Sequence, residues 1–339
     1  MNQTPDPLAS SGSFPAARFI KEIGRGKKGA RSMSRDDARD LYAAMLERRV
    51  SDLELGGIVL AMRIKGESVD EIAGFLDAAE ASFAPLTMPA SDYAPIVIPS
   101  YNGSRNIPNL TPLLALLLAR HGAPVLIHGV TSDPGRVTTA EILFELGLRP
   151  AQSHADAQAG FARHEPVFMP VESLAPRMAG LLALRGILGV RNSTHTLVKI
   201  MQPFAGPALR LTSYTHPEYL EMLSAYFETA APVERGDAFL MRGTEGETVA
   251  NPKRAQQIEW FHGHQRTVLV QKQEPVDDMP PLPHSSDAQT TAKWIAQALK
   301  GEQPVPGPIL EQVEHCLHVA KHLHATRVFH ENAGSSRAG

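Results

Sequence analysis

The residues with the clearest chemical potential form a run of positive charges near the start of the chain. Between residues 18 and 35 the only acid is Glu22, whereas seven basic side chains are present: Arg18, Lys21, Arg25, Lys27, Lys28, Arg31 and Arg35. Glycines separate them, so the backbone could adapt to a partner. Such a segment can follow the phosphates of a nucleic acid without reading its bases. The candidates for these contacts are Arg25, Lys27, Lys28 and Arg31.

The same segment has a simpler interpretation. Runs of lysine and arginine are commonly solvated and keep a protein in solution, and composition alone favours this reading. The formal net charge of the whole chain is −3 at pH 7, so there is no global attraction to a polyanion. Only the local distribution of charge could produce one.

Histidines near the end of the chain are a second chemical candidate. His315, His318 and His322 would share one face of a helix, a spacing that can bind a transition metal. No chelating loop accompanies them, so solvated histidines on an amphipathic helix are the favoured interpretation. We predict no metal site and no cofactor.

Composition indicates an ordinary globular protein. The chain has 339 residues, of which 43% are hydrophobic, enough for two lobes with their own cores. The single cysteine, Cys316, excludes an internal disulfide framework. The N-terminus lacks a signal-peptide pattern, and no apolar run is long enough to cross a bilayer. We therefore expect a cytoplasmic protein without a membrane partner.

Capping signals predict a small helical domain over residues 15–85, after a polar and disordered leader over 1–14. Ser34 can cap one helix, and capping boxes at Ser51–Glu54 and Ser68–Glu71 begin two more. Apolar residues within each helix recur at helical spacing. These three helices would form a compact unit.

Alternating strands and helices predict an α/β domain over residues 90–330 with a central, mainly parallel sheet. The expected strands are 96–98, 124–127, 167–169, 239–241 and 268–270. The expected helices are 111–120, 138–146, 174–188, 219–227, 289–299 and 309–324. Prolines make residues 274–284 a surface loop.

Two sequence patterns carry a resemblance to a known family. The stretch SRDDARDLYAAMLERRVSDLELGGIVLAMRIKGESVDEIAGFLDA, with its continuation to about residue 246, resembles anthranilate phosphoribosyltransferase. The pair IKEIGRGKKGAR and GVRNSTHTLVKIMQPF more closely resembles the YbiB branch of that family, whose members diverge from the enzymes and are described as nucleic-acid-binding proteins. The resemblance implies the nucleoside phosphorylase/phosphoribosyltransferase class IV fold. It reverses the preference for a merely solvated basic segment.

The resemblance also implies a degenerate phosphate loop. In the enzymes a Gly-Thr-Gly-Gly-Asp loop lets backbone N–H groups approach the pyrophosphate of phosphoribosyl pyrophosphate. Here residues 99–104 read Pro-Ser-Tyr-Asn-Gly-Ser, and the enzymes' magnesium-binding Asp-Glu pair is loosely matched by Glu245 and Glu247. A vestigial cleft is expected from these positions and from Arg185, which matches the acceptor-binding arginine: Tyr101, Asn102, Gly103, Asn106, His128, Gly129 and Arg185. Arg185 could equally be a structural ion-pair partner. No catalytic residue is predicted.

The enzymes that this chain resembles form dimers through the helical domain, which implies a homodimer here as well. A helical return around residues 172–195 is expected to pack on that domain. Two subunits could then bring further cations into one basic surface: Arg191, Lys199 and Arg210.

Three functions remain open. The leading one is non-sequence-specific DNA or RNA binding without turnover. The second is an active glycosyltransferase or phosphoribosyltransferase that uses an altered phosphate loop and an unknown acceptor. The third is a regulatory protein–protein module, for which the basic segment would be incidental.

Overall fold

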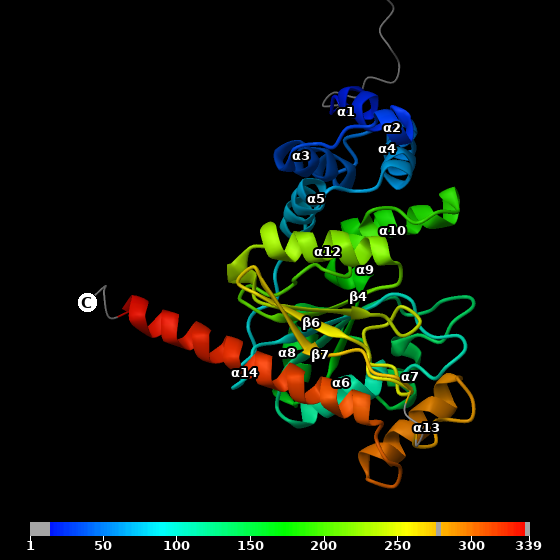
Figure 1. Ribbon diagram of the computed structural model, residues 1–339, viewed down its shortest axis with the longest axis vertical. Coiled ribbons are helices and arrows are strands. Elements are labelled where there is room, and N and C mark those ends of the chain that lie inside the picture. Colours follow the sequence, from blue (N-terminus) through cyan, green and yellow to red (C-terminus); the bar gives the residue numbers. More distant parts are fainter. Residues whose placement is uncertain (1–13, 276–278, 336–339) are drawn as a thin grey trace, which may run out of the picture. The chain divides into compact units, whose positions relative to one another are not determined.

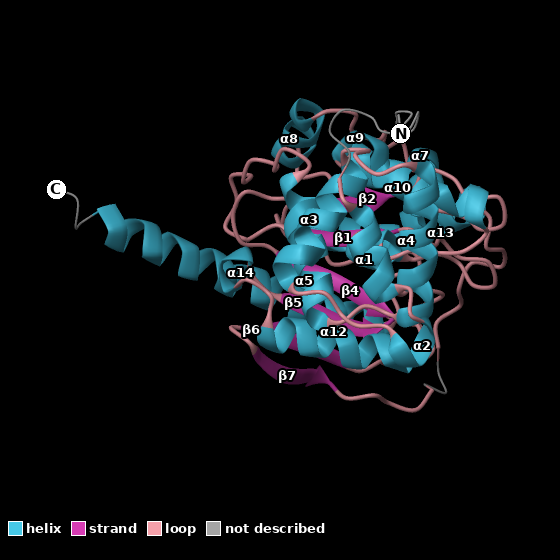
Figure 2. Cartoon of the chain, turned by 90° about the horizontal axis from the view of Figure 1, so that it is seen from above, coloured by secondary structure: helices cyan, strands magenta, loops and turns pink. Residues whose placement is uncertain are grey.

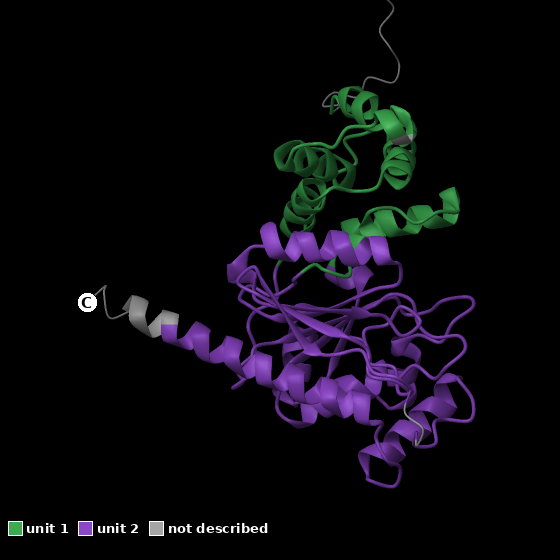
Figure 3. Ribbon diagram, viewed as in Figure 1, with its two compact units in different colours: residues 1–84, 175–201 green, residues 85–174, 202–339 purple. Residues whose placement is uncertain are grey.

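The computed structural model describes residues 14–275 and 279–335, except for the side chains of residues 27 and 330–335. The predicted leader, apart from Phe14, lies outside this range. The chain divides into two compact units, residues 1–84 with 175–201 and residues 85–174 with 202–339, which Figure 3 colours separately. Unit 1 is helical, with α1 Ala16–Ile23, α2 Gly26–Gly29, α3 Arg35–Leu46, α4 Asp52–Lys65, α5 Val69–Ala81, α10 Pro176–Leu188 and α11 Thr194–Leu197.

Side-chain caps start the helices of unit 1 where the sequence predicts. The Ser34 side chain accepts a hydrogen bond from the backbone N–H of Asp37 at the start of α3. Complete capping boxes open α4 at Ser51 and α5 at Ser68. Each box satisfies backbone donors that a helix cannot satisfy by itself. Local sequence therefore determines where these helices begin.

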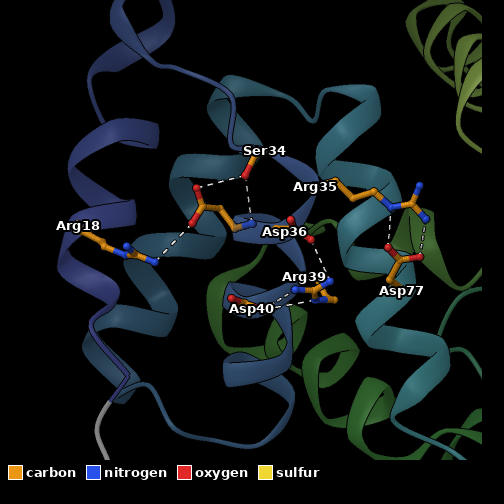
Figure 4. A network of polar contacts seen from close by, with 8 residues as sticks. Arg18, Ser34, Arg35, Asp36, Arg39, Asp40 and Asp77 are labelled. Atoms are coloured by element: carbon orange, nitrogen blue, oxygen red, sulfur yellow. Dashed lines mark hydrogen bonds and ion pairs between the residues drawn. The ribbon is translucent and has the colours of Figure 1, made fainter.

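Close packing of α3 against α5 forms the centre of unit 1. Gly74 lies in α5 where the backbone of α3 passes so near that a side chain would collide with it. The Arg35 guanidinium donates two hydrogen bonds to the Asp77 carboxylate, at 2.6 and 2.8 Å, and ties the same helices together at their edge (Figure 4). A paired guanidinium fork fixes orientation as well as distance.

Unit 2 is built on a seven-stranded sheet in the order β3-β2-β1-β4-β5-β6-β7. The strands are β1 Ile96–Ser100, β2 Val125–Gly129, β3 Val167–Pro170, β4 Leu209–Tyr214, β5 Ala238–Arg242, β6 Ile258–His262 and β7 Gln265–Val270. Strands β3, β2, β1, β4 and β5 run parallel, whereas β6 and β7 add antiparallel strands at one edge. This confirms the predicted fold class of a helical domain plus an α/β domain with a mainly parallel sheet.

Helices cover both faces of this sheet, as its buried strands require. They are α6 Thr111–Arg120, α7 Thr139–Glu145, α8 His154–Ala162, α9 Val171–Leu174, α12 Pro217–Thr229, α13 Ala288–Leu299 and α14 Gly307–Ser335, with a 3₁₀ turn η1 at Val233–Arg235. Figure 1 shows α12 on one face and α6 with α14 on the other. Helix α14 continues beyond the predicted residue 324 and extends past the sheet (Figure 2).

Two strands, β4 and β6, are absent from the sequence prediction because each contains a buried charged residue. Arg210 interrupts β4 and Glu259 interrupts β6, and both side chains are almost completely buried. Arg266 of β7 donates to Glu259 at 2.7 Å, so its carboxylate is paired across the two strands. A charged residue in a short segment indicates a loop, because the sequence does not show which residue will pair with it once it is buried.

The contact at Gly74 gives a test of the packing in unit 1. The Cβ of Gly74→Ala would lie 2.1 Å from the Arg35 carbonyl oxygen, so the two helices must separate. We expect a loss of about 2 kcal/mol or more in the free energy of unfolding, measured by urea denaturation. Gly57→Ala in α4 is the control, because its Cβ meets nothing within 4 Å and should be neutral or stabilising. Equal stability of the two variants would contradict the close approach.

Candidate nucleic-acid interface

The cationic segment is largely helical, and its single acid pairs with two of its cations. Residues 16–29 form α1 and α2 rather than the adaptable loop that the glycines suggest. Buried Phe19 and Ile23 anchor α1 in unit 1. The Glu22 carboxylate accepts a hydrogen bond from Arg25 at 2.6 Å and lies 3.9 Å from the Arg31 guanidinium. Arg25 and Arg31, both predicted to bind phosphate, are therefore paired with a carboxylate of the same segment.

The same segment still presents positive charge to solvent. Lys28 is exposed, and 72% of the Arg31 side chain is accessible. The side chain of Lys27 lies outside the described part of the chain. Exposed ion pairs are weak because water screens them, so a phosphate can replace Glu22 at little cost.

A second group of cations lies at the end of α10, in the same unit. Helix α10 stops at Gly189, which adopts a left-handed conformation. The amide of buried Asn192 donates to the Leu181 carbonyl at 2.7 Å, and the Asn192 Oδ1 accepts from the Thr194 N–H at 3.0 Å. This asparagine therefore fixes the turn that leads from α10 into α11.

The fixed turn brings three predicted residues together around a histidine. His195 is half-buried, and the pKa of its imidazole falls to about 4 because of burial, then the charges of Arg191, Arg185 and Lys199. Burial is the main cause of this shift, and the three cations add to it. Arg185, Arg191, His195 and Lys199 are called here the 185–199 cluster; Arg185 and Arg191 are exposed, whereas His195 and Lys199 are half-buried.

Arg210 does not join either group. Its side chain is 2% exposed in β4, donates to the Gly236 carbonyl at 3.2 Å and lies 5.4 Å from the centre of the Phe227 ring. A guanidinium in this position supports the sheet instead of meeting a ligand. The buried position of Arg210 therefore does not fit its predicted role as a nucleic-acid contact.

The residues of the predicted vestigial cleft lie in unit 2, at or after the carboxyl ends of β1 and β2, except for Arg185, which belongs to unit 1. The Tyr101 hydroxyl lies 2.8 Å from Nδ1 of His128, which is completely buried. Burial lowers the pKa of His128 to about 3, so the imidazole is neutral. Burial, with the charge of Glu172, raises the pKa of Tyr101. A neutral pair carries no positive charge that could balance that of a phosphate.

The ends of β1 and β2, next to Tyr101 and His128, are packed closely against each other. Gly129 ends β2 opposite Ser100 of β1, and a Cβ there would lie 1.7 Å from the Ser100 carbonyl oxygen. The two strands are therefore held in contact at the base of the loop.

The loop amides that would bind a pyrophosphate are taken by carboxylates of the chain itself. One Glu247 oxygen accepts from the N–H groups of Asn102 and Gly103, at 2.9 and 2.7 Å. The Glu245 carboxylate accepts from the N–H groups of Arg105 and Asn106, and the Asn106 amide donates to it at 2.7 Å. Glu245 and Glu247, which loosely match the enzymes' magnesium-binding pair, thus supply the negative charge that these loop N–H groups bind.

The electrostatics agree with this arrangement. Partial burial would raise the pKa of Glu245, but the hydrogen bonds from Arg105 and Asn106 outweigh burial and lower it. Glu247 is fully buried beneath the loop. Both Glu245 oxygens and Oε1 of Glu247 accept hydrogen bonds from N–H groups, so these atoms do not fit as ligands of a magnesium ion, and the amides do not fit a pyrophosphate.

Within the described part of the chain, no three His, Cys, Asp or Glu side chains gather as metal ligands. His322 of α14 instead contacts His262 of β6, with ring centres 5.6 Å apart. Over the same residues, no helix is both long and apolar enough to cross a bilayer.

Comparisons with known proteins bear on this geometry. Residues 17–82 match the helical bundle domain of the glycosyl transferase family. The YbiB protein of Escherichia coli (strain K12) is 48% identical over 301 residues, covering 88% of this chain and 92% of that protein. The chain belongs to the YbiB family. This confirms the resemblance seen in the sequence.

The YbiB family is related to phosphoribosyl-transferring enzymes. Anthranilate phosphoribosyltransferase from Rhodopseudomonas palustris (strain BisA53) is 30% identical over 195 residues, which cover 56% of this chain and 54% of the enzyme. The enzyme from Thermus thermophilus superposes with a TM-score of 0.67 at 20% identity, covering 91% and 89% of the two chains. The Saccharomyces cerevisiae enzyme, in complex with PRPP and Mg, gives 0.66 at 13% identity, covering 92% and 95%. These structures share the fold with the YbiB-family chain.

The sequence does not reveal the roles of three residues that organise these sites. Glu22 stands out only as the single acid among the cations, and Glu247 only as a loose match to the magnesium pair, far from the loop that it fills. His195 is absent from the predicted site residues. Its spacing of four residues from both Arg191 and Lys199 was the signal that could have identified it.

The internal anions of the YbiB-family chain can be tested through stability. Glu247→Gln removes the charge that accepts two backbone N–H groups. We expect the free energy of unfolding to fall by about 1.5–3 kcal/mol in urea denaturation, because hydrogen bonds to charged acceptors are the stronger ones. Glu221→Gln, on the exposed face of α12, should change it by less than about 0.5 kcal/mol. Unchanged stability, together with magnesium-dependent binding of phosphoribosyl pyrophosphate to the wild type, would overturn this account.

Proposed function

We propose that this protein binds DNA or RNA through the phosphate backbone, without base recognition, and that it does not transfer phosphoribosyl groups. The observation that carries the proposal is a contrast between the two units. Unit 1 presents exposed cations at Lys28, Arg31 and Arg185, whereas the anion loop of unit 2 is filled by Glu245 and Glu247. This contrast supports phosphate binding at the surface of unit 1 rather than at the loop after β1.

The chemistry of the surface supports a polyanion over a small substrate. Guanidinium and ammonium groups bind phosphate oxygens of any sequence and at any position along a strand. Arg25 and Arg31 share the Glu22 carboxylate in the free protein, so a phosphate that binds either of them competes with that carboxylate. Phosphate contacts release counterions from the nucleic acid, so the affinity should depend strongly on salt, with log K falling by roughly 0.9 for each phosphate contact on duplex DNA and 0.7 on a single strand.

We also propose a homodimer through the helical unit. A groove of about 790 Å³ runs between α3, α4 and α10, lined mainly by apolar residues such as Met45, Leu55 and Leu184. Large apolar side chains beside it are exposed, with Leu53 at 87% and Ile187 at 82%. Such surface is characteristic of protein association, and a twofold axis would double the number of cationic groups available to one strand.

The nucleic-acid proposal is tested by charge reversal. The Lys28→Glu/Arg31→Glu variant should lose about tenfold in affinity for labelled single- and double-stranded oligonucleotides at low salt, in fluorescence anisotropy. The salt slope should also fall, because fewer phosphate contacts remain. Binding should persist when phosphoribosyl pyrophosphate and magnesium are added as competitors. Failure of the wild type to bind any oligonucleotide at low salt would reject the proposal.

Two control variants sharpen this test. Lys293→Glu/Lys300→Glu places the same charge change on exposed positions around α13 in unit 2 and should reproduce only the effect of net charge. Glu22→Gln should act in the opposite direction and raise affinity, because it releases Arg25 and Arg31 from their internal partner. Equal effects of the two double variants would leave the cationic segment without a specific role.

The dimer is tested with Leu53→Glu/Ile187→Glu. Both side chains are exposed in the single chain, so the variant should fold normally. We expect sedimentation to show a dimer for the wild type at micromolar concentration and a monomer for the variant, since two charges would be buried on association. Val233→Glu, at a side chain 54% exposed in unit 2, is the control. A monomeric wild type would exclude the dimer and leave the cationic surface of each chain to act by itself.

A further inference from the structure

A histidine of β6 and a histidine of α14 meet beside the sheet of unit 2. The ring centres of His262 and His322 lie 5.6 Å apart, with the ring planes inclined by 67°. Both residues are exposed, so an ion from solution can reach them. Over the described part of the chain, Nε2 of His262 and both ring nitrogens of His322 make no hydrogen bond. Two imidazoles with available nitrogen atoms are therefore adjacent.

A buried carboxylate fixes the orientation of the His262 ring. Nδ1 of His262 lies 2.9 and 3.1 Å from the two oxygens of Asp237, and the Trp260 indole N–H donates to the same carboxylate at 2.7 Å. Asp237 is 3% exposed. Burial raises its pKa, and the hydrogen bonds from Trp260 and His262 limit that rise. An ionised carboxylate can only accept, so in neutral His262 the proton is on Nδ1 and the lone pair is on Nε2.

This arrangement is suited to a metal ion. Histidines that bind metals commonly donate their other ring N–H to a carboxylate, which fixes the ring and makes the ligand nitrogen more basic. A metal about 2.1 Å from a ligand nitrogen lies about 3.2 Å from the ring centre, so two imidazoles on a tetrahedral ion have ring centres about 5.3 Å apart. The 5.6 Å between His262 and His322 is close to this separation. Because His322 is exposed, its ring can rotate to direct a nitrogen toward the same ion.

Helix α14 offers a third imidazole. His318 precedes His322 by four residues in a continuous helix, so the two share one face, and both are exposed. Paired histidines at this spacing bind zinc in helical metal sites. Over the described residues the three rings are not gathered around one point, so His318 has to change rotamer, as an exposed side chain can. The spacing on α14 alone favours solvated histidines, and the adjacent ring from β6 changes that preference.

We propose that His262, His318 and His322 bind a divalent transition-metal ion such as Zn²⁺, with Asp237 orienting His262 and water completing a tetrahedral shell. Imidazole nitrogen suits Zn²⁺, Cu²⁺ and Ni²⁺, whereas Mg²⁺ prefers oxygen ligands. All four residues belong to unit 2, and the site is independent of the proposed nucleic-acid function. Its ligands come from β6 and α14, so a bound ion attaches this helix to the antiparallel edge of the sheet.

The experiment is isothermal titration calorimetry of the full chain, without an affinity tag, with Zn²⁺ and with Mg²⁺. We expect one Zn²⁺ per chain with a Kd of about 10 μM or below, and no binding of Mg²⁺. His262→Gln, His318→Gln and His322→Gln should each weaken Zn²⁺ binding by about tenfold or more, because each removes one ligand. His121→Gln, an exposed histidine elsewhere in unit 2, is the matched control and should leave the affinity unchanged.

Two further measurements test the geometry. Asp237→Asn should weaken Zn²⁺ binding by about 10- to 100-fold while all three ligands remain, with circular dichroism as the check of folding. Zn²⁺ should also raise the Tm of the wild type but not that of His262→Gln, because the ion binds only the folded site.

The ligand variants decide the outcome even where Asp237→Asn does not fold. Absence of Zn²⁺ binding by the wild type at about 100 μM would overturn the site. Unchanged affinity in any of the three ligand variants, or an equal loss in His121→Gln, would do the same, since the ion would then bind scattered surface histidines. None of these results depends on whether the chain binds an oligonucleotide.

Discussion

The attachment of the β1 loop to the carboxylates of Glu245 and Glu247 is the interaction on which the chemistry of this protein depends. Backbone N–H groups in a tight loop attract anions, and a buried carboxylate satisfies them permanently without a ligand. Glu247 reaches Asn102 and Gly103, and Glu245 reaches Arg105 and Asn106, so the loop after β1 is joined to the turn after β5. The fold of a phosphoribosyl-transferring enzyme is retained, while the amides that would meet its substrate serve internal structure.

A comparable use of internal acids occurs in unit 1, with a different energetic outcome. Glu22 holds Arg25 and Arg31, as Glu247 holds the loop amides, but Glu22 is solvent-accessible and Glu247 is fully buried. A buried acceptor costs several kcal/mol to leave without partners, whereas an exposed ion pair contributes about 1 kcal/mol or less. The loop amides held by Glu247 are therefore closed to competing anions, whereas the ion pairs of Glu22 are weak enough for another anion to compete with its carboxylate. Burial decides which of them can function as a binding surface.

Most of the fold follows from local sequence, but the sites depend on contacts between distant residues. The caps at Ser34, Ser51 and Ser68 act within three residues, so the sequence pattern predicts those helix starts directly. Strands β4 and β6 escape prediction because Arg210 and Glu259 find their partners only once the sheet has formed. The loss of the phosphate loop is readable from its missing glycines, yet nothing near Asn102 indicates that a residue 145 positions away fills it.

The local charge of unit 1 cannot be read from the net charge of the chain. A net charge of −3 gives no attraction to a polyanion, and acids outnumber bases in the chain. Many of those acids are engaged, as Asp77 is by Arg35 and Glu71 by Lys65, and they therefore contribute little field at the surface. The cations that the proposed function assigns to nucleic acid are at the surface of unit 1, where Lys28 and Arg31 are exposed. The low pKa of His195 follows first from burial, and the nearby cations lower it further.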